Sequence, residues 1–335
     1  MKSIIGHRKR LLFMIAAIFI MIAGYIVLHS IRGLMDHTKM VMGGRFFKHT
    51  EESEENNIIT VNEEVEEYFR PSDLPVLNNR NFSRLFTENY FDKKVSEIVL
   101  PEYFMETPQE TIINYFSVLR EAANWQKGKN AGCGTLGRSK TPYPTAYHFL
   151  SSGYRNKTTY EQYLDSFLNI LHINLLKYKE VPVFGEASDT KRYFIEIETI
   201  EGSDKDVAYF AYYYGFIDLV KEGNRYEIDS IEYHGENYLC APYHGWAYDA
   251  QMNVAIRYGN WCSLIKEKYP MQQEGYVKKI LFQGTDGYDY MIEFFQLTND
   301  TDIEIAQYRK KDDGNWELIK LDPEKCLDND MDDND

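Results

Sequence analysis

Between residues 238 and 248 the chain gathers residue types that often bind a small ligand. A histidine, a tryptophan and three tyrosines lie within these positions. Such rings combine an apolar face with a polar edge, which suits a sugar, a peptide or an aromatic ligand. We therefore predict ligand binding by Tyr243, His244 and Trp246. Packing of this loop over the edge of a sheet would explain the same cluster and stays open as the alternative.

Tyrosines also crowd residues 209–214, a segment that alternates like a β-strand. The alternation places Tyr212 and Tyr214 on one face and Tyr209 and Tyr213 on the other. One face can line a cavity while the other meets a partner, so Tyr212 and Tyr214 join the candidate ligand-binding residues. No acidic residue nearby is singled out as a base, and the sequence therefore predicts no catalytic residue.

The four cysteines are Cys133, Cys240, Cys262 and Cys326. They include no C-x-x-C pair and no cysteine and histidine spacing of a zinc site, so we predict neither a metal nor a cofactor. In an oxidising compartment a Cys240–Cys262 disulfide is one option, and Cys133 would then pair with Cys326 by elimination. Four isolated, partly buried thiols are the alternative.

An apolar run near the amino terminus predicts a membrane anchor. Residues 11–31 contain no Asp, Glu, Lys or Arg, and as a helix they would span roughly 31 Å, the thickness of a bilayer core. The run is longer than the ~7–15 apolar residues of a cleaved signal peptide, and no small-x-small cleavage pattern follows it. We predict an uncleaved signal-anchor that holds the protein in the cell membrane by a single pass.

Charge divides the chain into a basic head and an acidic body. Residues 1–48 hold eight basic side chains against one acidic side chain, a charge of +7; the whole chain carries −15, and the rest therefore −22. An acidic body excludes nucleic acid as its partner, because phosphates need the opposite sign. The cluster Arg8, Lys9 and Arg10 favours a cytoplasmic amino terminus (residues 1–10) and an extracytoplasmic body. A cytoplasmic body is the alternative.

Helices are predicted after a stalk and lead-in at residues 32–106. Thr107-Pro108-Gln109-Glu110 combines an N-cap hydroxyl, a proline at the first helical position and a glutamate at N3, which predicts a helix that runs to Gly128. A short helix is predicted at residues 145–154, and a second capping box at Thr158 predicts a third.

Strands follow the helices, because the apolar period changes from about 3.6 residues to two. Four strands are predicted at residues 173–183, 191–200, 207–220 and 226–233. Gly202 and Gly215 lie where long strands would need to bend, which predicts a curved sheet. Helices followed by a meander of strands indicate an α+β fold with an antiparallel sheet.

This order of elements resembles the nuclear transport factor 2-like (NTF2-like) superfamily, whose domains form a cone. The helix entry at residues 107–116 is typical of its bacterial members. The resemblance covers residues 107–236 and implies helices packed on a curved sheet. Enzymes of the superfamily are similar in pairing an acidic base with a Tyr or Asp donor inside the cone, whereas anchored members resemble subunits of conjugation and secretion channels.

A second series of elements occupies residues 237–326. A helix is predicted at residues 249–269, and turns rich in Asp, Asn and Gly separate the strands that follow. Those strands are predicted at residues 276–283, 288–297, 302–310 and 316–321. The segment is either a second, smaller α+β unit or a β-extension of the first domain. Residues 327–335 are a solvated acidic tail that lacks the glycine and closing glutamate of a calcium loop.

Together these features predict one function and two alternatives. We predict a bacterial membrane protein with a non-enzymatic binding or scaffold body outside the cytoplasm, held in the lipid bilayer by residues 11–31. Its partner would be a second copy, which associates through the open aromatic sheet, or another protein of an envelope assembly. The alternatives are a cone that binds or converts a small molecule, and a sensor of cell-wall fragments.

Overall fold

The computed structural model describes residues 70, 72–80, 86, 89–91, 93–129, 138–185, 189–205, 207–236 and 245–327. The predicted anchor at residues 11–31 and the end of the acidic tail lie outside these ranges, as do Cys133 and Cys240. None of the helices within them is long and apolar enough to cross a membrane. The anchor and the orientation of the chain therefore stay predictions.

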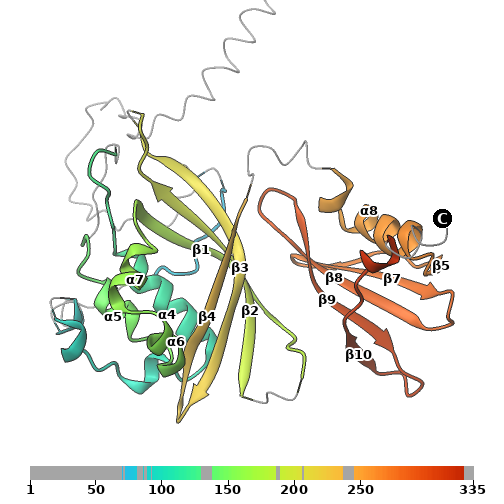
Figure 1. The fold of residues 1–335 in the computed structure, drawn as a ribbon, viewed down its shortest axis with the longest axis horizontal. Helices are drawn as coiled ribbons and strands as arrows, with labels where there is room; N and C mark the ends of the chain where they lie inside the picture. Colours follow the sequence, from blue (N-terminus) through green and yellow to red (C-terminus); the bar gives the residue numbers. More distant parts are fainter. Residues whose placement is uncertain are drawn as a thin grey trace, which may run out of the picture. The chain divides into compact units, whose positions relative to one another are not determined.

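The described chain is an α+β structure with two open antiparallel sheets (Figure 1). The first sheet has the strand order β1-β2-β3-β4. The second has the order β10-β9-β8-β7-β5, with β6 paired to β7. The predicted α+β class and the antiparallel meanders are confirmed, and the strands after residue 245 form a sheet of their own.

The described helices before the first sheet do not all begin at side-chain caps, but three of them do. The helices of this region are η1 (Val95–Glu97), η2 (Glu102–Phe104), α4 (Pro108–Arg120), α5 (Tyr143–Tyr147), α6 (Ser152–Lys157) and α7 (Tyr160–Asp165). Thr107 caps α4 as predicted, but the helix ends well before Gly128, because the backbone beyond it bonds elsewhere, as in Ala123 N–H to Ser139 O. The capping box of α7 is made by Thr159 and Gln162, one residue later than predicted.

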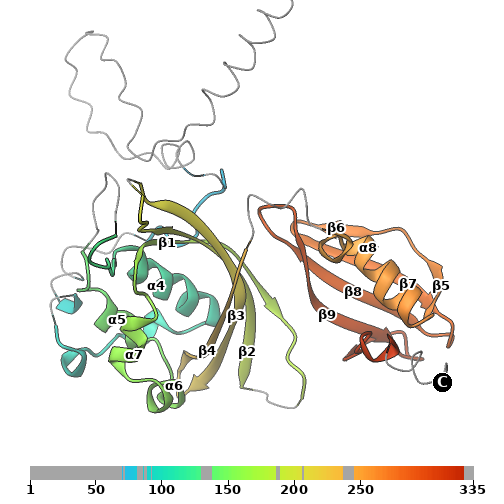
Figure 2. The same ribbon diagram turned by 45° about the horizontal axis from the view of Figure 1, so that its top comes forward.

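The first sheet packs its concave face on these helices (Figure 2). Its strands are β1 (Ile170–Val181), β2 (Thr190–Glu201), β3 (Tyr209–Glu222) and β4 (Arg225–Gly235). Alternate residues of β2, such as Ile195 and Ile197, enter the core with the aromatic residues of α4. At Gly215 a Cβ atom would lie 1.7 Å from the carbonyl oxygen of Glu232. Only glycine therefore fits where β3 bends against β4.

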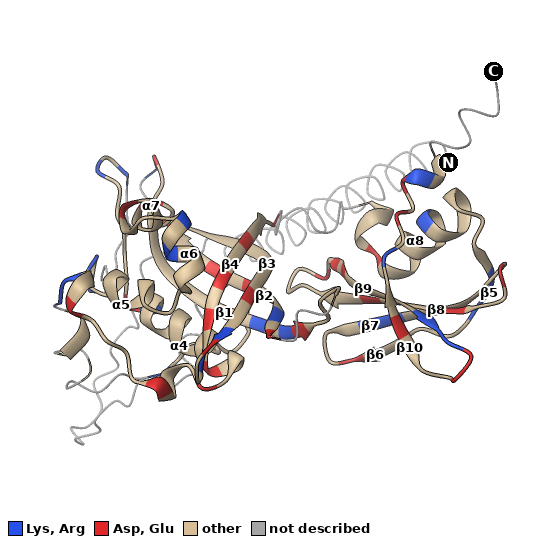
Figure 3. Cartoon of the chain, turned by 60° about the horizontal axis from the view of Figure 1, so that its bottom comes forward, with Lys and Arg blue, Asp and Glu red and all other residues tan. Residues whose placement is uncertain are grey.

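The opposite face of the first sheet, called the outer face below, is buried in part, chiefly along β2. Phe194, Glu196 and Glu198 of β2 belong to this face and are all fully buried. The ring of Phe194 lies 4.8 Å from that of Phe295 in the second sheet, within a small apolar core that the two sheets share. Acidic residues colour the strands of the first sheet in Figure 3, and the burial of Glu196 and Glu198 takes two of these carboxylates out of water.

The lead-in also covers β1, which is an edge strand of the first sheet. Asn78 holds the lead-in against this strand. Asn78 is fully buried; its amide donates to the carbonyl oxygens of Phe116 and Ile173, and its own oxygen accepts from Leu175 N–H. Leu77 N–H donates to Leu175 O at 2.9 Å. The edge of β1 is thus paired with residues 77 and 78, which protects it from pairing with another chain.

The second sheet carries one short helical segment on its face. Its strands are β5 (Ile265–Lys268), β6 (Gln272–Glu274), β7 (Val277–Gly284), β8 (Asp289–Gln296), β9 (Asp302–Lys310) and β10 (Trp316–Ile319). The helix predicted at residues 249–269 is instead η4 (Trp246–Tyr248), α8 (Ala250–Val254), a π-helical turn η5 (Ala255–Trp261) and β5. Val254 and Tyr258 anchor this segment on Phe282 and Ile292.

Candidate functional site

A buried cluster of charges lies where the outer face of the first sheet meets the second sheet. The ammonium of Lys177 in β1 lies 2.9 Å from Glu196 Oε2, and it donates to Gln296 O at 2.9 Å. Its Nζ also lies 4.1 Å from the centre of the Tyr276 ring. Glu196 Oε1 accepts from Thr298 N–H at 2.7 Å. Lys177 and Glu196 therefore join the two sheets by charge as well as by apolar packing.

Glu236, just after β4, is the third member of this cluster. Both of its carboxylate oxygens are buried and have no hydrogen-bond partner among the described residues. Burial and then the charge of Glu196 raise the pKa of Glu236 to about 9, against the opposing effect of Lys177. Burial in turn lowers the pKa of Lys177, while Glu196 raises it. At neutral pH Glu236 therefore keeps its proton.

The Glu236→Gln variant is expected to remove a pH dependence of folding. The pKa of Glu236 lies near 4.5 in the unfolded chain and near 9 in the folded chain, so the folded state binds more protons in this range. The free energy of unfolding of the parent should therefore fall as the pH rises from 5 to 9, by up to about 1.4 kcal/mol per pH unit. In urea titrations across this range, equal slopes for the variant and the parent would show that Glu236 does not hold the proton.

A third buried acidic side chain, Glu198, is occupied on both oxygens. Arg70 and Asn174 donate to Oε1 at 3.3 and 3.0 Å, and Ser72 and Tyr212 donate to Oε2 at 2.8 and 2.6 Å. A carboxylate has about four lone-pair positions. All are used, so Glu198 ties the lead-in and β3 to β2 and offers no position for a substrate proton.

Glu201 at the end of β2 is held in the same way on the concave face. Tyr213 and Thr199 donate to Oε1 at 2.7 and 2.9 Å, and Tyr209 donates to Oε2 at 3.0 Å. Burial first, and then the hydrogen bond to Glu201, raise the pKa of Tyr213. This acid and tyrosine pairing has the residue types of a proton-transfer site, but its hydroxyls already bond the carboxylate.

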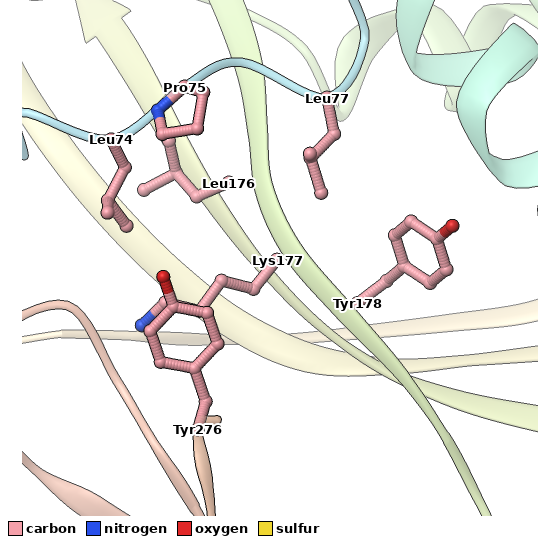
Figure 4. A pocket seen from close by; sticks show the side chains of 7 residues that line it. All are labelled: Leu74, Pro75, Leu77, Leu176, Lys177, Tyr178 and Tyr276. Carbon is pink, nitrogen blue, oxygen red and sulfur yellow. The ribbon is translucent and has the colours of Figure 1, made fainter. Parts of the chain in front are cut away.

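An apolar cavity of about 170 Å³ lies beside Lys177 (Figure 4). Figure 4 shows Lys177 beneath the Tyr276 ring, with the lead-in crossing above β1. The cavity is lined by Leu74, Pro75, Leu77, Leu176, Lys177, Tyr178 and Tyr276. Because the Lys177 ammonium already contacts Glu196 and Gln296 O, the cavity offers chiefly apolar contact.

A polar cavity of about 310 Å³ lies against the second sheet. Its lining comes from the segment before α8, from β7, and from β8, β9 and the turn between them. The lining residues are Gly245, Tyr248, Asp249, Lys278, Gln296, Asp300, Thr301 and Asp302. Three carboxylates surround it, yet no group of three or more metal-ligating side chains among the described residues is placed to hold a metal ion. The cavity offers hydrogen-bond donors, acceptors and one aromatic ring.

The structure gives structural partners to Tyr212 and Tyr214, the two tyrosines of β3 that the sequence predicted to bind a ligand. Tyr212 is 3% exposed and donates a hydrogen bond to Glu198. The sequence predicted an open aromatic face for self-association, and at Tyr212 this face is closed. Tyr214 stacks on Phe194. Burial raises the pKa of Tyr214, and the nearby Tyr248 and Glu236 raise it further.

The nominated loop is described only in part. Tyr243 and His244 lie outside the described residues. Trp246 is 38% exposed and packs edge-to-face against Trp261 at 5.5 Å. It does not line either cavity, but its neighbours Gly245 and Tyr248 line the polar one.

The disulfide differs from the pairing considered above. Cys262 is bonded to Cys326, with a Cα–Cα distance of 5.1 Å. The Cys240–Cys262 bridge, and with it Cys133–Cys326, is therefore wrong. Spacing alone could not give the pairing, because the bond depends on the chain after β10 returning to the end of η5. It ties the carboxy-terminal segment to the second sheet.

The sequence analysis missed the buried ionisable residues Lys177, Glu196 and Glu236. A signal was present for the first two, because each has apolar neighbours on both sides in its strand, Leu176 and Tyr178 around Lys177 and Ile195 and Ile197 around Glu196. In a strand with alternating apolar and polar residues, charged residues such as these are predicted to lie on the face that water covers. Only the tertiary cover by the lead-in and the second sheet makes them buried.

Known proteins give no further guide to these sites. The order of helices and strands is the whole basis of the NTF2-like resemblance, and the residues of the two cavities form no motif that the sequence alone would reveal. Comparison of the chain with protein-family models, with curated proteins and with solved structures finds no match.

Proposed function

We propose that the chain is a membrane-anchored binding or scaffold protein whose body lies outside the cytoplasm. The observation that carries the proposal is the Cys262–Cys326 disulfide. Disulfides persist in oxidising compartments and are rare in the cytosol. The apolar run at residues 11–31 and the basic cluster before it support the same placement, with the amino terminus inside.

Packing of the first unit favours a binding or scaffold role over catalysis. The space between the helices and the concave face of β1 to β4 is filled by large side chains, among them Tyr115, Phe116, Phe149 and Tyr163. The acid and tyrosine groups at its rim are bonded to one another around Glu201. Helices ahead of four antiparallel strands support an NTF2-like first unit, which agrees with the role of anchored members in envelope assemblies.

A second candidate function, a sensor of cell-wall fragments, is favoured by the polar cavity. Its lining includes Gly245 and Tyr248 from the segment that the sequence nominated. A ligand in this cavity would contact the same loop that carries Trp246. Such a role is compatible with the anchored placement and adds a ligand to it.

Redox trapping in intact cells tests the placement. Cells are quenched with acid and alkylated before and after reduction, and the Cys262→Ser and Cys326→Ser variants identify the two thiols by mass. We expect both thiols to be labelled only after reduction. Full labelling before reduction, in cells grown aerobically, would place the body in a reducing compartment and contradict the proposal.

A further inference from the structure

The polar cavity is built from side chains that are fixed before any ligand arrives. Asp302, which is 3% exposed, accepts from Ala250 N–H at 2.9 Å and forms an ion pair with Lys278 at 2.9 Å. Gln296 donates to Asp300 Oδ1 at 3.1 Å, and Gln273 donates to the Gln296 side-chain oxygen at 3.1 Å. A lining that is already ordered lowers the entropy cost of binding.

Hydrogen-bonding capacity remains in this lining. Asp249 uses Oδ1 to cap α8 at Met252 N–H, and Asp300 uses Oδ1 for Gln296. The second oxygen of each carboxylate has no hydrogen bond to a described residue, and both side chains are exposed at the cavity. The ammonium of Lys278, whose side chain is 14% exposed, has three N–H donors, and its pair with Asp302 leaves donor capacity for the cavity. Acceptors and a donor thus converge on one space.

Charge and shape select among ligands. Three carboxylates against one ammonium give the lining a net negative charge, which repels phosphate, sulfate and carboxylate ligands. Tyr248, which is 42% exposed, contributes the aromatic ring of the lining, a group that suits contact with C–H groups. The volume of about 310 Å³ lies at the lower end of the range for small-molecule sites. Hydroxyl groups that both donate and accept, on a compact ring with one apolar face, match this lining.

We propose that the polar cavity binds one neutral sugar ring of a glycan. Asp249 and Asp300 accept from ring hydroxyls, Lys278 donates to one, and Tyr248 stacks on the apolar face of the ring. This inference deepens the binding role proposed above and rests on it for its biological meaning. Binding itself is a property of the purified chain, so its failure is distinguishable from a failure of the predicted location.

Calorimetric titration of the full chain tests the proposal, in a zwitterionic detergent whose headgroup is not a sugar. The probes are chitotriose and maltotriose, both neutral, and sialyllactose, which is anionic. We expect at least one neutral trisaccharide to bind, with the anionic one about tenfold weaker or more. The two neutral probes distinguish an amino-sugar polymer from a glucan. Absence of binding by both neutral probes at millimolar concentration would overturn the proposal, and so would stronger binding of sialyllactose.

Matched variants locate the binding. Asp300→Asn keeps an Oδ1 acceptor for Gln296 and tolerates the φ of +64° at this position, so the fold is retained. We expect this variant and Tyr248→Ala each to weaken sugar binding about tenfold. Asp313→Asn, in the turn before β10, and Tyr288→Ala, of similar exposure to Tyr248, should bind like the parent. Equal binding by all four variants would contradict the assignment of the cavity.

Discussion

Lys177→Met is expected to lower the free energy of unfolding by about 3–5 kcal/mol, as measured by urea denaturation of the full chain at pH 7. Methionine keeps the length of the side chain but removes the charge. Glu196, which is fully buried, then loses the ammonium at 2.9 Å and keeps only Thr298 N–H on its other oxygen. An uncompensated buried carboxylate is among the costliest single defects in a folded protein.

A matched control exists on the same sheet. The ammonium of Lys191 lies 2.9 Å from the carboxylate of Glu180, the same distance as between Lys177 and Glu196. The side chains of Lys191 and Glu180, however, are both nearly half exposed. Lys191→Met should therefore cost less than about 1 kcal/mol. Adding Glu196→Gln to Lys177→Met should restore more than half of the loss, because it removes the unpaired charge. Equal effects of Lys177→Met and Lys191→Met would show that the cluster does not join the two sheets.

Cys262→Ser is expected to lower the free energy of unfolding by about 4 kcal/mol, because the bond to Cys326 closes a loop of 64 residues in the unfolded chain. The loss should fall on the second sheet first, since the bond ties the chain after β10 to the end of η5. Hydrogen exchange of β7 to β10 would report this loss directly.

A thermodynamic cycle separates the bond from other effects of the substitution. Cys326→Ser alone should cost the same as Cys262→Ser, and the double variant should cost no more than either single variant. Reducing agent should destabilise the parent and leave all three variants unchanged. Additive losses in the double variant would mean that the two sulfur atoms act independently, which the disulfide forbids.

Local chemistry made most elements of the fold predictable. The Thr107 cap and the proline after it locate the start of α4, and alternation locates β1 to β4 and β7 to β10 within a few residues. Helix ends were less predictable, because they depend on where the next backbone groups bond. The helix expected at residues 249–269 failed because the π-helical turn η5 and the strand β5 take up its second half, which apolar periodicity does not distinguish from a continuing α-helix.

The candidate sites were less predictable than the fold. Both require residues far apart in the chain, as in the contact of Lys177 with Gln296 O. The segment predicted to bind a ligand contributes Gly245 and Tyr248 to the polar cavity. Tyr212, which was also predicted to bind a ligand, instead donates a structural hydrogen bond to Glu198. A pattern of residue types shows which groups can bind, whereas burial and prior hydrogen bonds decide which of them remain accessible.

The central claim, an anchored protein with its body outside the cytoplasm, is tested most directly by paired topology reporters. Alkaline phosphatase and green fluorescent protein are fused in turn after Asp335, which leaves the Cys262–Cys326 bond intact. Alkaline phosphatase folds only outside the cytoplasm and Sec-exported green fluorescent protein fluoresces only inside it. The account predicts high phosphatase activity with no fluorescence from the fusions in membranes. Fluorescent membranes without phosphatase activity would contradict it.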